Sequence, residues 1–465
     1  MTRFTLLLAL LGGAIWTPVK AAEPTRSLHA LQEDFVNLRF GMFIHFNMPT
    51  FFPGDWPDPD ASPEAFTPRH LDCDQWAEAA VSAHMSYGCL TTKHHSGFCI
   101  WDTRTTDYSS MHSPVKRDVV KEYVEAFRKR GLKTMLYYSM LDTHHRIRPG
   151  HIKPENTEMI LQQLTELLTH YGEIDALVID GWDAPWSRIS YEEIPFERIY
   201  LHIKSLQPNC LVMDLNAAKY PADALFYGDI KPYEQNAGQH ISKETNRLPA
   251  MSCLPLNGAW FWEPRFPEEP VKDPQELVEK NLRPFNEAYC NFMLNVSPNA
   301  DGKLDDNALV ALKEMGEMWE PSKKRIRVPD GIAPIVASNL AKGRPAESSW
   351  SDDMWIMDFA NDDDFGTSWI SHPSVEKPWW EVELGKGTRF NMITLFEAEP
   401  RVESYKLEFW DGSHWKTLAA GRGEKQGRLT VHRFEEVEAE KVRIEIEKFH
   451  APPVIAEFGV YHETR

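Results

Sequence analysis

Between about residues 36 and 320, short apolar runs alternate with longer stretches whose apolar residues recur at helical spacing. The short runs predict strands at Phe40–Phe46, Tyr87–Thr92, Lys133–Met140, Ile174–Gly181, Cys210–Leu215, Ala224–Ile230, Met251–Leu254 and Asn291–Val296. The longer stretches predict helices at Asp74–His84, Val115–Arg130, Asn156–Tyr171, Phe196–Leu206, Pro274–Cys290 and Asn307–Trp319. This repeated order implies parallel strands joined by right-handed crossovers.

The six to eight strand–helix units favour an α/β fold of the (β/α)8-like barrel type, which takes about 250 residues. The alternative is a doubly wound open sheet, but no glycine-rich phosphate loop follows the first strand. The helical pattern stops near Val328, and short alternating runs then predict an all-β sandwich. Its expected strands are Trp379–Leu384, Met392–Glu397, Ser404–Trp410, Leu429–Phe434, Lys441–Glu447 and Ile455–Tyr461.

The N-terminus has the pattern of a signal peptide: a basic residue, the apolar run Phe4–Trp16, and small residues before Ala22. The apolar run is too short to span a bilayer. We therefore expect a signal peptide at 1–21, a catalytic barrel domain at 22–327 and a sandwich domain at 328–465. The mature chain is expected to be exported, periplasmic or extracellular, and soluble, with no membrane span.

The formal net charge is −19, which disfavours binding to nucleic acid or anionic lipid and suits a neutral substrate. None of the six cysteines lies in a C-x-x-C pair, so the sequence does not favour a zinc site. Free buried thiols are the first expectation, and disulfides formed after export are the alternative.

Several polar residues end predicted barrel strands, where barrel enzymes hold their active sites. His45 ends the first strand, the pair His94 and His95 ends the second, and Tyr138 lies at the end of the third. Neutral imidazoles there would hydrogen-bond a ligand. A metal site is the weaker alternative, because no third ligand stands at a zinc-binding spacing.

Asp180 closes the apolar run of the fourth predicted strand and is followed by Gly181. A carboxylate in this position is costly to desolvate unless it is paired or functional. The structural alternative is that Asp180 caps the following loop. Its place at the barrel mouth favours a functional carboxylate.

Motifs spread in order over the barrel region resemble those of glycoside hydrolase family 29, the α-L-fucosidases. They are Phe40–His45, Thr92–Phe98 with Trp101-Asp102, Lys116–Val120, Leu136–Ser139, Gln163–Leu167, Ile179–Gly181 and Leu294–Asn299 with Asp301-Gly302. The resemblance implies a (β/α)8-like barrel and a retaining double displacement that releases terminal α-L-fucose. It places Asp180 as the nucleophile and His45, His94, His95 and Tyr138 against the fucose.

The chain also departs from the family pattern. Phe46-Asn47 stands in place of Trp-Gly, Ser96 in place of Asp, and Asp55-Trp56 in place of a Glu-Trp pair. These departures leave two sugars open, L-fucose and the closely related L-galactose, so an α-L-galactosidase on the same scaffold is an alternative.

A retaining glycosidase needs a second carboxylate about 5–5.5 Å from the nucleophile. Glu234 is the preferred acid/base because it follows a strand-like run and leads into a loop. The other candidates are Asp229, Glu244 and Glu263. Trp182 or Trp260 would pack against the apolar face of the sugar. No cofactor is expected, and the partner is a fucosylated glycan or oligosaccharide.

The sandwich region resembles a discoidin-type domain (coagulation factor 5/8 C, as in some carbohydrate-binding modules), and this resemblance implies a jelly-roll sandwich. The similar segments are Gly366–Trp369, Trp380–Gly385, Tyr405–Gly412, Val442–Ile444 and Ile455–Phe458. Sugar binding and a purely structural role against the barrel both stay open for this domain. Asp362, Asp363 and Asp364 are candidate ligands for a structural calcium ion, or a solvated loop.

Two rival functions remain. A secreted glycan-binding protein that has lost catalysis would result if the acid/base were missing. A metal-dependent hydrolase using the paired histidines would contain bound zinc.

Overall fold

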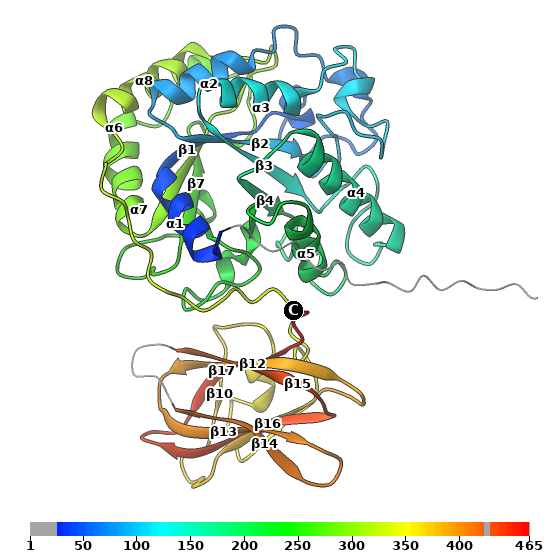
Figure 1. The fold of residues 1–465 in the computed structure, drawn as a ribbon, viewed down its shortest axis with the longest axis vertical. Coiled ribbons are helices and arrows are strands. Elements are labelled where there is room, and N and C mark those ends of the chain that lie inside the picture. Colours follow the sequence, from blue (N-terminus) through cyan, green and yellow to red (C-terminus); the bar gives the residue numbers. More distant parts are fainter. Residues whose placement is uncertain (1–25, 423–427, 465) are drawn as a thin grey trace, which may run out of the picture.

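The computed structural model describes residues 26–422 and 428–464. In this part of the chain, eight parallel strands form one sheet in the order β5-β4-β3-β2-β1-β8-β7-β6 (Figure 1). The nearly closed sheet confirms the expected (β/α)8-like barrel. Its strands are β1 (Phe40–Ile44), β2 (Tyr87–Lys93), β3 (Lys133–Ser139), β4 (Ala176–Asp180), β5 (Leu211–Asp214), β6 (Lys231–Glu234), β7 (Ala250–Pro255) and β8 (Cys290–Asn295).

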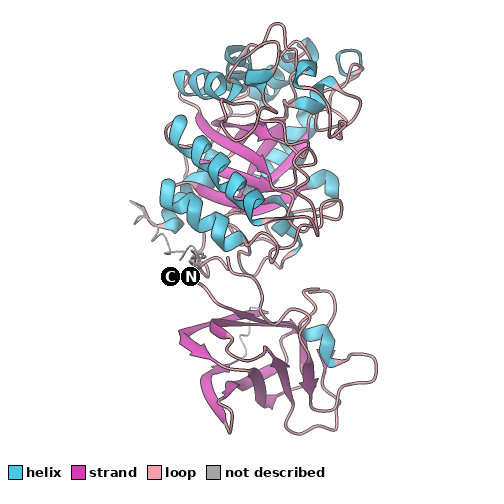
Figure 2. Cartoon of the chain, turned by 90° about the vertical axis from the view of Figure 1, so that its right-hand side faces the viewer, coloured by secondary structure: helices cyan, strands magenta, loops and turns pink. Residues whose placement is uncertain are grey.

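Helices cover the outer face of the sheet (Figure 2). They are α1 (Leu28–Leu38), α2 (Cys73–Ser82), α3 (Val119–Lys129), α4 (Pro154–His170), α5 (Phe196–Leu206), α6 (Pro274–Glu276), α7 (Arg283–Glu287) and α8 (Asp306–Met318). A π-helical turn, Leu277–Leu282, joins α6 to α7, so the predicted helix Pro274–Cys290 exists as three consecutive pieces. Helix α3 illustrates how the sequence determines where a helix begins and which face is buried. Asp118 caps its first turn, and Val120, Val124 and Phe127 form its buried face.

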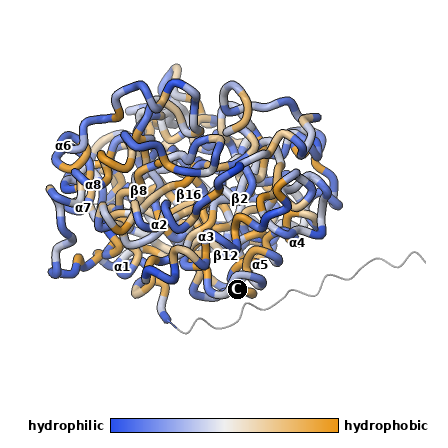
Figure 3. The backbone as a smooth tube through the Cα atoms, turned by 90° about the horizontal axis from the view of Figure 1, so that it is seen from above, coloured by the Kyte–Doolittle hydropathy of each residue, from blue (hydrophilic) through white to orange (hydrophobic). Residues whose placement is uncertain are grey.

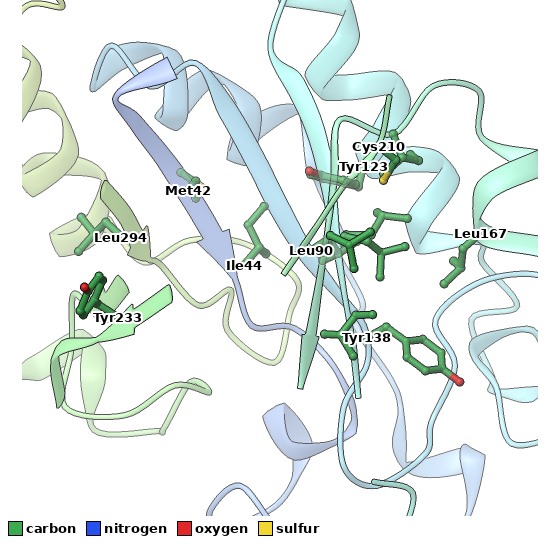
Figure 4. Packing of buried hydrophobic residues seen from close by; sticks show 14 of the residues in the cluster. Met42, Ile44, Leu90, Tyr123, Tyr138, Leu167, Cys210, Tyr233 and Leu294 are labelled. Atoms are coloured by element: carbon green, nitrogen blue, oxygen red, sulfur yellow. The ribbon is translucent and has the colours of Figure 1, made fainter. Parts of the chain in front are cut away.

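Side chains of the barrel strands alternate between two apolar layers. The inner layer includes Phe43, Met135, Tyr137 and Val178. The outer layer lies between strands and helices, and Figure 4 shows part of it, including Ile44, Leu90 and Tyr138. Because both faces are buried, the strands are continuous apolar runs rather than alternating ones.

One predicted strand is wrong. Residues Ala224–Ile230 form no strand, and β6 begins only at Lys231. This apolar run makes isolated β-bridges instead. In one of them Phe226 pairs with Ile335 of the segment between the domains. Strands β5 and β6 are therefore the two ends of the described sheet, and a short 3₁₀ helix, η4 (Leu215–Lys219), follows β5 and contacts β6.

The second domain is an antiparallel sandwich of a four-stranded and a five-stranded sheet, as expected. Its strands are β9 (Ala346–Ser348), β10 (Trp369–Ile370), β11 (Trp379–Glu383), β12 (Arg389–Glu399), β13 (Val402–Trp410), β14 (Trp415–Arg422), β15 (Leu429–Glu438), β16 (Lys441–Phe449) and β17 (Val454–Tyr461). All six predicted strands are present, and β9, β10 and β14 are additional. Trp380, Ile444 and Phe458 belong to its core.

The two domains share buried apolar contacts. Phe396 and Tyr461 of the sandwich belong to the same buried cluster as the outer layer of the barrel. At the C-terminus, the backbone N–H of Thr464 donates to Glu197 of α5 at 2.6 Å. Seen from above, hydrophilic positions gather at the periphery of the molecule, in loops and on helices alike (Figure 3). The predicted domain boundary at 327/328 lies in the segment between α8 and β9 and stays a prediction.

The expected signal peptide, residues 1–21, lies outside the described residues. Over the described ranges, no helix combines the length and the apolar character needed to cross a bilayer. All six cysteines are buried and unpaired, which agrees with the first expectation for them.

Gly181, directly after β4, is a position where glycine is required. Its φ is +101°, and a Cβ atom there would lie 2.8 Å from the backbone nitrogen of Leu141. We expect Gly181→Ala to lower the free energy of unfolding by about 2–4 kcal/mol, from backbone strain plus overpacking. Gly150→Ala is the matched control: φ is +71°, but nothing lies within 4 Å, so only the strain remains. Equal losses of stability in chemical denaturation would contradict the packing argument.

Candidate active site

A cavity of about 180 Å³ opens at the C-terminal ends of the barrel strands. It brings together six of the residues singled out from the sequence, namely His45, His94, His95, Asp180, Glu234 and Trp260. The other lining residues are Phe43, Asp55, Trp56, Tyr137, Trp186 and Leu215. Its volume is below the roughly 300–1,000 Å³ of pockets for drug-sized ligands, so it suits one small ring.

Asp180 ends β4 and is buried, with 8% of its surface exposed. Its Oδ2 accepts a hydrogen bond from the Tyr137 hydroxyl at 2.7 Å. Its Oδ1 accepts from the Gly181 N–H at 2.7 Å and from the Asn216 side-chain amide at 2.8 Å. His95 Nε2 lies 3.8 Å from Oδ2. Three donors thus satisfy the oxygens of this carboxylate and fix its orientation.

The three cavity histidines are buried, and burial favours their neutral form. It lowers the pKa of His45 to about 3 and that of His95 to about 4, and it holds the pKa of His94 well below its usual value. His45 Nδ1 is paired with Asn295 Oδ1 and His95 Nδ1 with Ser139 Oγ, both at 2.7 Å. These bonds orient the rings.

The Nδ1 atom of His94 is buried and has no hydrogen-bond partner within the described structure. A buried polar atom without a hydrogen-bond partner costs free energy. We therefore expect a polar group of the ligand to hydrogen-bond this nitrogen. Three neutral imidazoles can both donate and accept hydrogen bonds. The cavity is therefore built to bind an uncharged polar molecule.

Glu234 ends β6 and faces the same cavity. Burial and then the charge of Asp180 raise its pKa to about 7, although hydrogen bonds from Asn236 and Trp260 oppose the shift. A carboxyl group with this pKa can both donate and accept a proton near neutral pH. The cavity thus pairs a hydrogen-bonded carboxylate with a titrating carboxyl group, the pattern of an acid/base site.

Aromatic rings surround the cavity. Trp56 and Trp186 are half-exposed and pack on His95, with ring centroids 5.0 and 4.2 Å from it. Trp260 lies 4.9 Å from the ring of His45. Flat apolar rings next to hydrogen-bonding groups fit the apolar face and the hydroxyl edge of a sugar ring.

Two predicted contact residues are not at the cavity. Tyr138 lies in the outer layer, where its hydroxyl donates to Gln163 at 2.6 Å (Figure 4). Its neighbour Tyr137 points to the cavity instead, because adjacent strand residues face opposite sides. Trp182 is fully buried and its Nε1 donates to the Ile194 carbonyl at 2.8 Å, since the backbone turns at Gly181.

The other acids considered from the sequence lie elsewhere. Asp229 is fully buried and binds Lys204 at 2.8 Å. Glu244 is exposed, and Glu263 pairs with Arg265 at 2.6 Å. Glu234 is thus the candidate acid that reaches the cavity. Asp55 also lines it, with a pKa raised by burial and by Glu263.

Sequence reasoning did not single out Phe43, Trp186, Leu215 or Asn216. Phe43 could have been found, because it lies two positions before His45 and side chains two positions apart in an extended segment share a face. The other three come from loops and from η4, where no periodicity indicates direction. Among the described residues, no group of three or more His, Cys, Asp or Glu side chains could hold a metal ion.

Comparison with known proteins identifies the class. The family model described as alpha-L-fucosidase matches residues 55–322, and the model of the F5/8 type C domain matches residues 345–458. The chain therefore belongs to the alpha-L-fucosidase family and carries a C-terminal F5/8 type C domain. This confirms both resemblances seen in the sequence.

Relatives and solved structures agree with this. Alpha-L-fucosidase 1 of Arabidopsis thaliana is 26% identical, over 90% of this chain and 84% of its own length. The structure of alpha-L-fucosidase isoenzyme 1 from Paenibacillus thiaminolyticus has a TM-score of 0.53 and 24% identity, covering 90% of this chain and 99% of its own. A Ruminococcus gnavus GH29 fucosidase in complex with fucose has a TM-score of 0.50 and 20% identity, covering 96% and 97%.

Proposed function

We propose that this protein is an exported, retaining exo-α-L-fucosidase that releases terminal fucose from glycans or oligosaccharides. The observation that carries the proposal is the pair of carboxyl groups in one cavity: Asp180, held by three hydrogen-bond donors, and Glu234, whose pKa is about 7. Family membership supplies the sugar. Export rests on the signal-peptide pattern at residues 1–21.

The first step is attack by an oxygen of Asp180 on the anomeric carbon. As the glycosidic bond breaks, Glu234 donates its proton to the leaving oxygen, and a covalent fucosyl ester of Asp180 forms. In the second step a water molecule loses a proton to Glu234 and attacks the same carbon. The ester breaks, Asp180 leaves as a carboxylate, and the sugar is released with net retention.

The cavity would bind the sugar without a cofactor. His45, His94 and His95 hydrogen-bond its hydroxyl groups, and the neutral rings suit an uncharged ligand. Phe43, Leu215 and Trp260 supply apolar lining, which favours a methyl group at carbon six over a hydroxymethyl group.

A substrate panel tests the proposal. The purified chain is expected to hydrolyse an aryl α-L-fucoside with initial release of α-L-fucose, seen by NMR. Because an apolar pocket rejects an added hydroxyl only modestly, kcat/KM for the matching α-L-galactoside should be lower by roughly 10- to 100-fold. If the α-L-galactoside were hydrolysed faster, the enzyme would be an α-L-galactosidase instead. Fucose binding without turnover of any substrate would instead identify a glycan-binding protein.

A further inference from the structure

The 3₁₀ helix η4 lies between the active-site cavity and the sandwich domain. At its start, Asn216 Nδ2 donates to Asp180 Oδ1 at 2.8 Å. At its end, Lys219 and Tyr220 reach Asp363 of the sandwich. Lys219 Nζ lies 3.9 Å from Asp363 Oδ2, and the Tyr220 hydroxyl donates to the same oxygen at 3.3 Å. One short segment therefore contacts both the candidate nucleophile and the second domain.

Within the barrel, buried groups fix η4 from two neighbouring strands. Asp214, at the end of β5, accepts a hydrogen bond from the Asn216 N–H at 3.0 Å. Lys231 of β6 donates to the carbonyl oxygens of Ala217 and Ala218, each at 3.0 Å. In the described sheet β5 and β6 are end strands: Gly228 bridges to Met213 of β5, and η4 contacts β6.

On the sandwich side, Asp363 is a fixed anchor. Its side chain is 9% exposed and lies 3.1 Å from Lys342. Its backbone N–H donates to the buried Glu457 at 3.1 Å. Beside it, the ring of Phe365 packs edge-on against Tyr220, with centroids 5.7 Å apart. The end of η4 thus rests on buried, paired groups of the second domain.

We propose that η4 is a positioning element through which the sandwich domain supports catalysis. Asn216 holds Asp180 oriented for attack, and Asp363 holds the far end of η4 so that Asn216 keeps its place. The inference rests on the proposed function, in which Asp180 is the nucleophile. The physical reason is that the amide donor fixes the position of the carboxylate and that a small displacement of a reacting group slows catalysis strongly.

The test is a double-mutant cycle on the full chain with an aryl α-L-fucoside. Asn216→Ala should lower kcat by roughly 10- to 100-fold, the effect of losing a hydrogen bond to a charged group. KM should change little, because Asn216 acts through Asp180. Asp363→Ala should lower kcat by roughly 3- to 10-fold. The kcat of the double variant should lie within about twofold of the kcat of Asn216→Ala, because both substitutions act through η4.

Two further variants distinguish a positioning role of Asp363 from a general loss of stability in the sandwich domain. Asp363→Asn keeps an oxygen that can accept from Tyr220, so it should recover most of the kcat lost in Asp363→Ala. Asp353→Ala removes an exposed acid of the same domain and should leave kcat unchanged. Melting temperatures of all variants check folding.

Unchanged kcat in Asn216→Ala or in Asp363→Ala, or fully additive losses in the double variant, would overturn the inference. These outcomes are distinct from failure of the proposed function, in which the wild-type chain itself would not hydrolyse the fucoside. Activity in the wild type with no effect of the variants contradicts only the role of η4.

Discussion

Replacing Asp180 by alanine is expected to lower kcat on an aryl α-L-fucoside by roughly 10⁴-fold or more, the scale at which loss of a nucleophile acts. The variant loses the oxygen that forms the covalent ester. Added azide should restore part of the turnover by entering the space left by the carboxylate and attacking the anomeric carbon. The product would be a fucosyl azide of inverted configuration, detectable by NMR.

Asp175→Asn is a matched control, because Asp175 lies just before β4 at the opposite end of the barrel, where it pairs with Lys133 at 2.9 Å. It should keep nearly the full kcat. A general fold defect would not respond to azide. Substantial activity in Asp180→Ala would show that another group is the nucleophile.

Glu234→Gln is expected to show the second large effect. Turnover of glycans with poor leaving groups should fall by roughly 10²- to 10⁴-fold, since the proton donor is lost. Aryl fucosides with good leaving groups need less protonation, so their first step should suffer less.

The pH dependence follows from the same group. Burial and the charge of Asp180 raise the Glu234 pKa to about 7, and the acid form is the one that protonates the leaving oxygen. Wild-type kcat/KM should therefore fall as pH rises through about 7, and Glu234→Gln should lack this basic limb. Glu263→Gln, which changes an acid paired with Arg265, should keep it. If Glu234→Gln kept the basic limb and Glu263→Gln lost it, Glu263 rather than Glu234 would be the acid/base.

Much of the fold could be predicted because burial on both faces gives barrel strands a strong apolar pattern. The run Ala224–Ile230 has the same apolar pattern but makes only isolated bridges: Phe226 pairs with Ile335 of the inter-domain segment, and Gly228 pairs with Met213 of β5. The apolar pattern of a segment indicates that it is buried, but it does not indicate which other segment it packs against.

The site could be predicted in part. Asp180 and His45 stand out because polar groups end apolar runs. Tyr137 and Tyr138 are chemically alike, so only the pairing of β3 with β4 decides which one faces the cavity. Trp182 was misplaced because the positive φ of Gly181 redirects the chain after β4. Asn216 was missed because its contact with Asp180 spans 36 residues of sequence.

The six buried cysteines have a practical consequence for making the protein. Each is unpaired, and burial raises the pKa of thiols such as Cys89, Cys253 and Cys290, which keeps them unreactive toward oxidants. The described fold therefore gains no stability from oxidation, even for a chain expected to be exported. Recombinant production can use a reducing cytoplasm, with no need for disulfide isomerases or an oxidising refolding step.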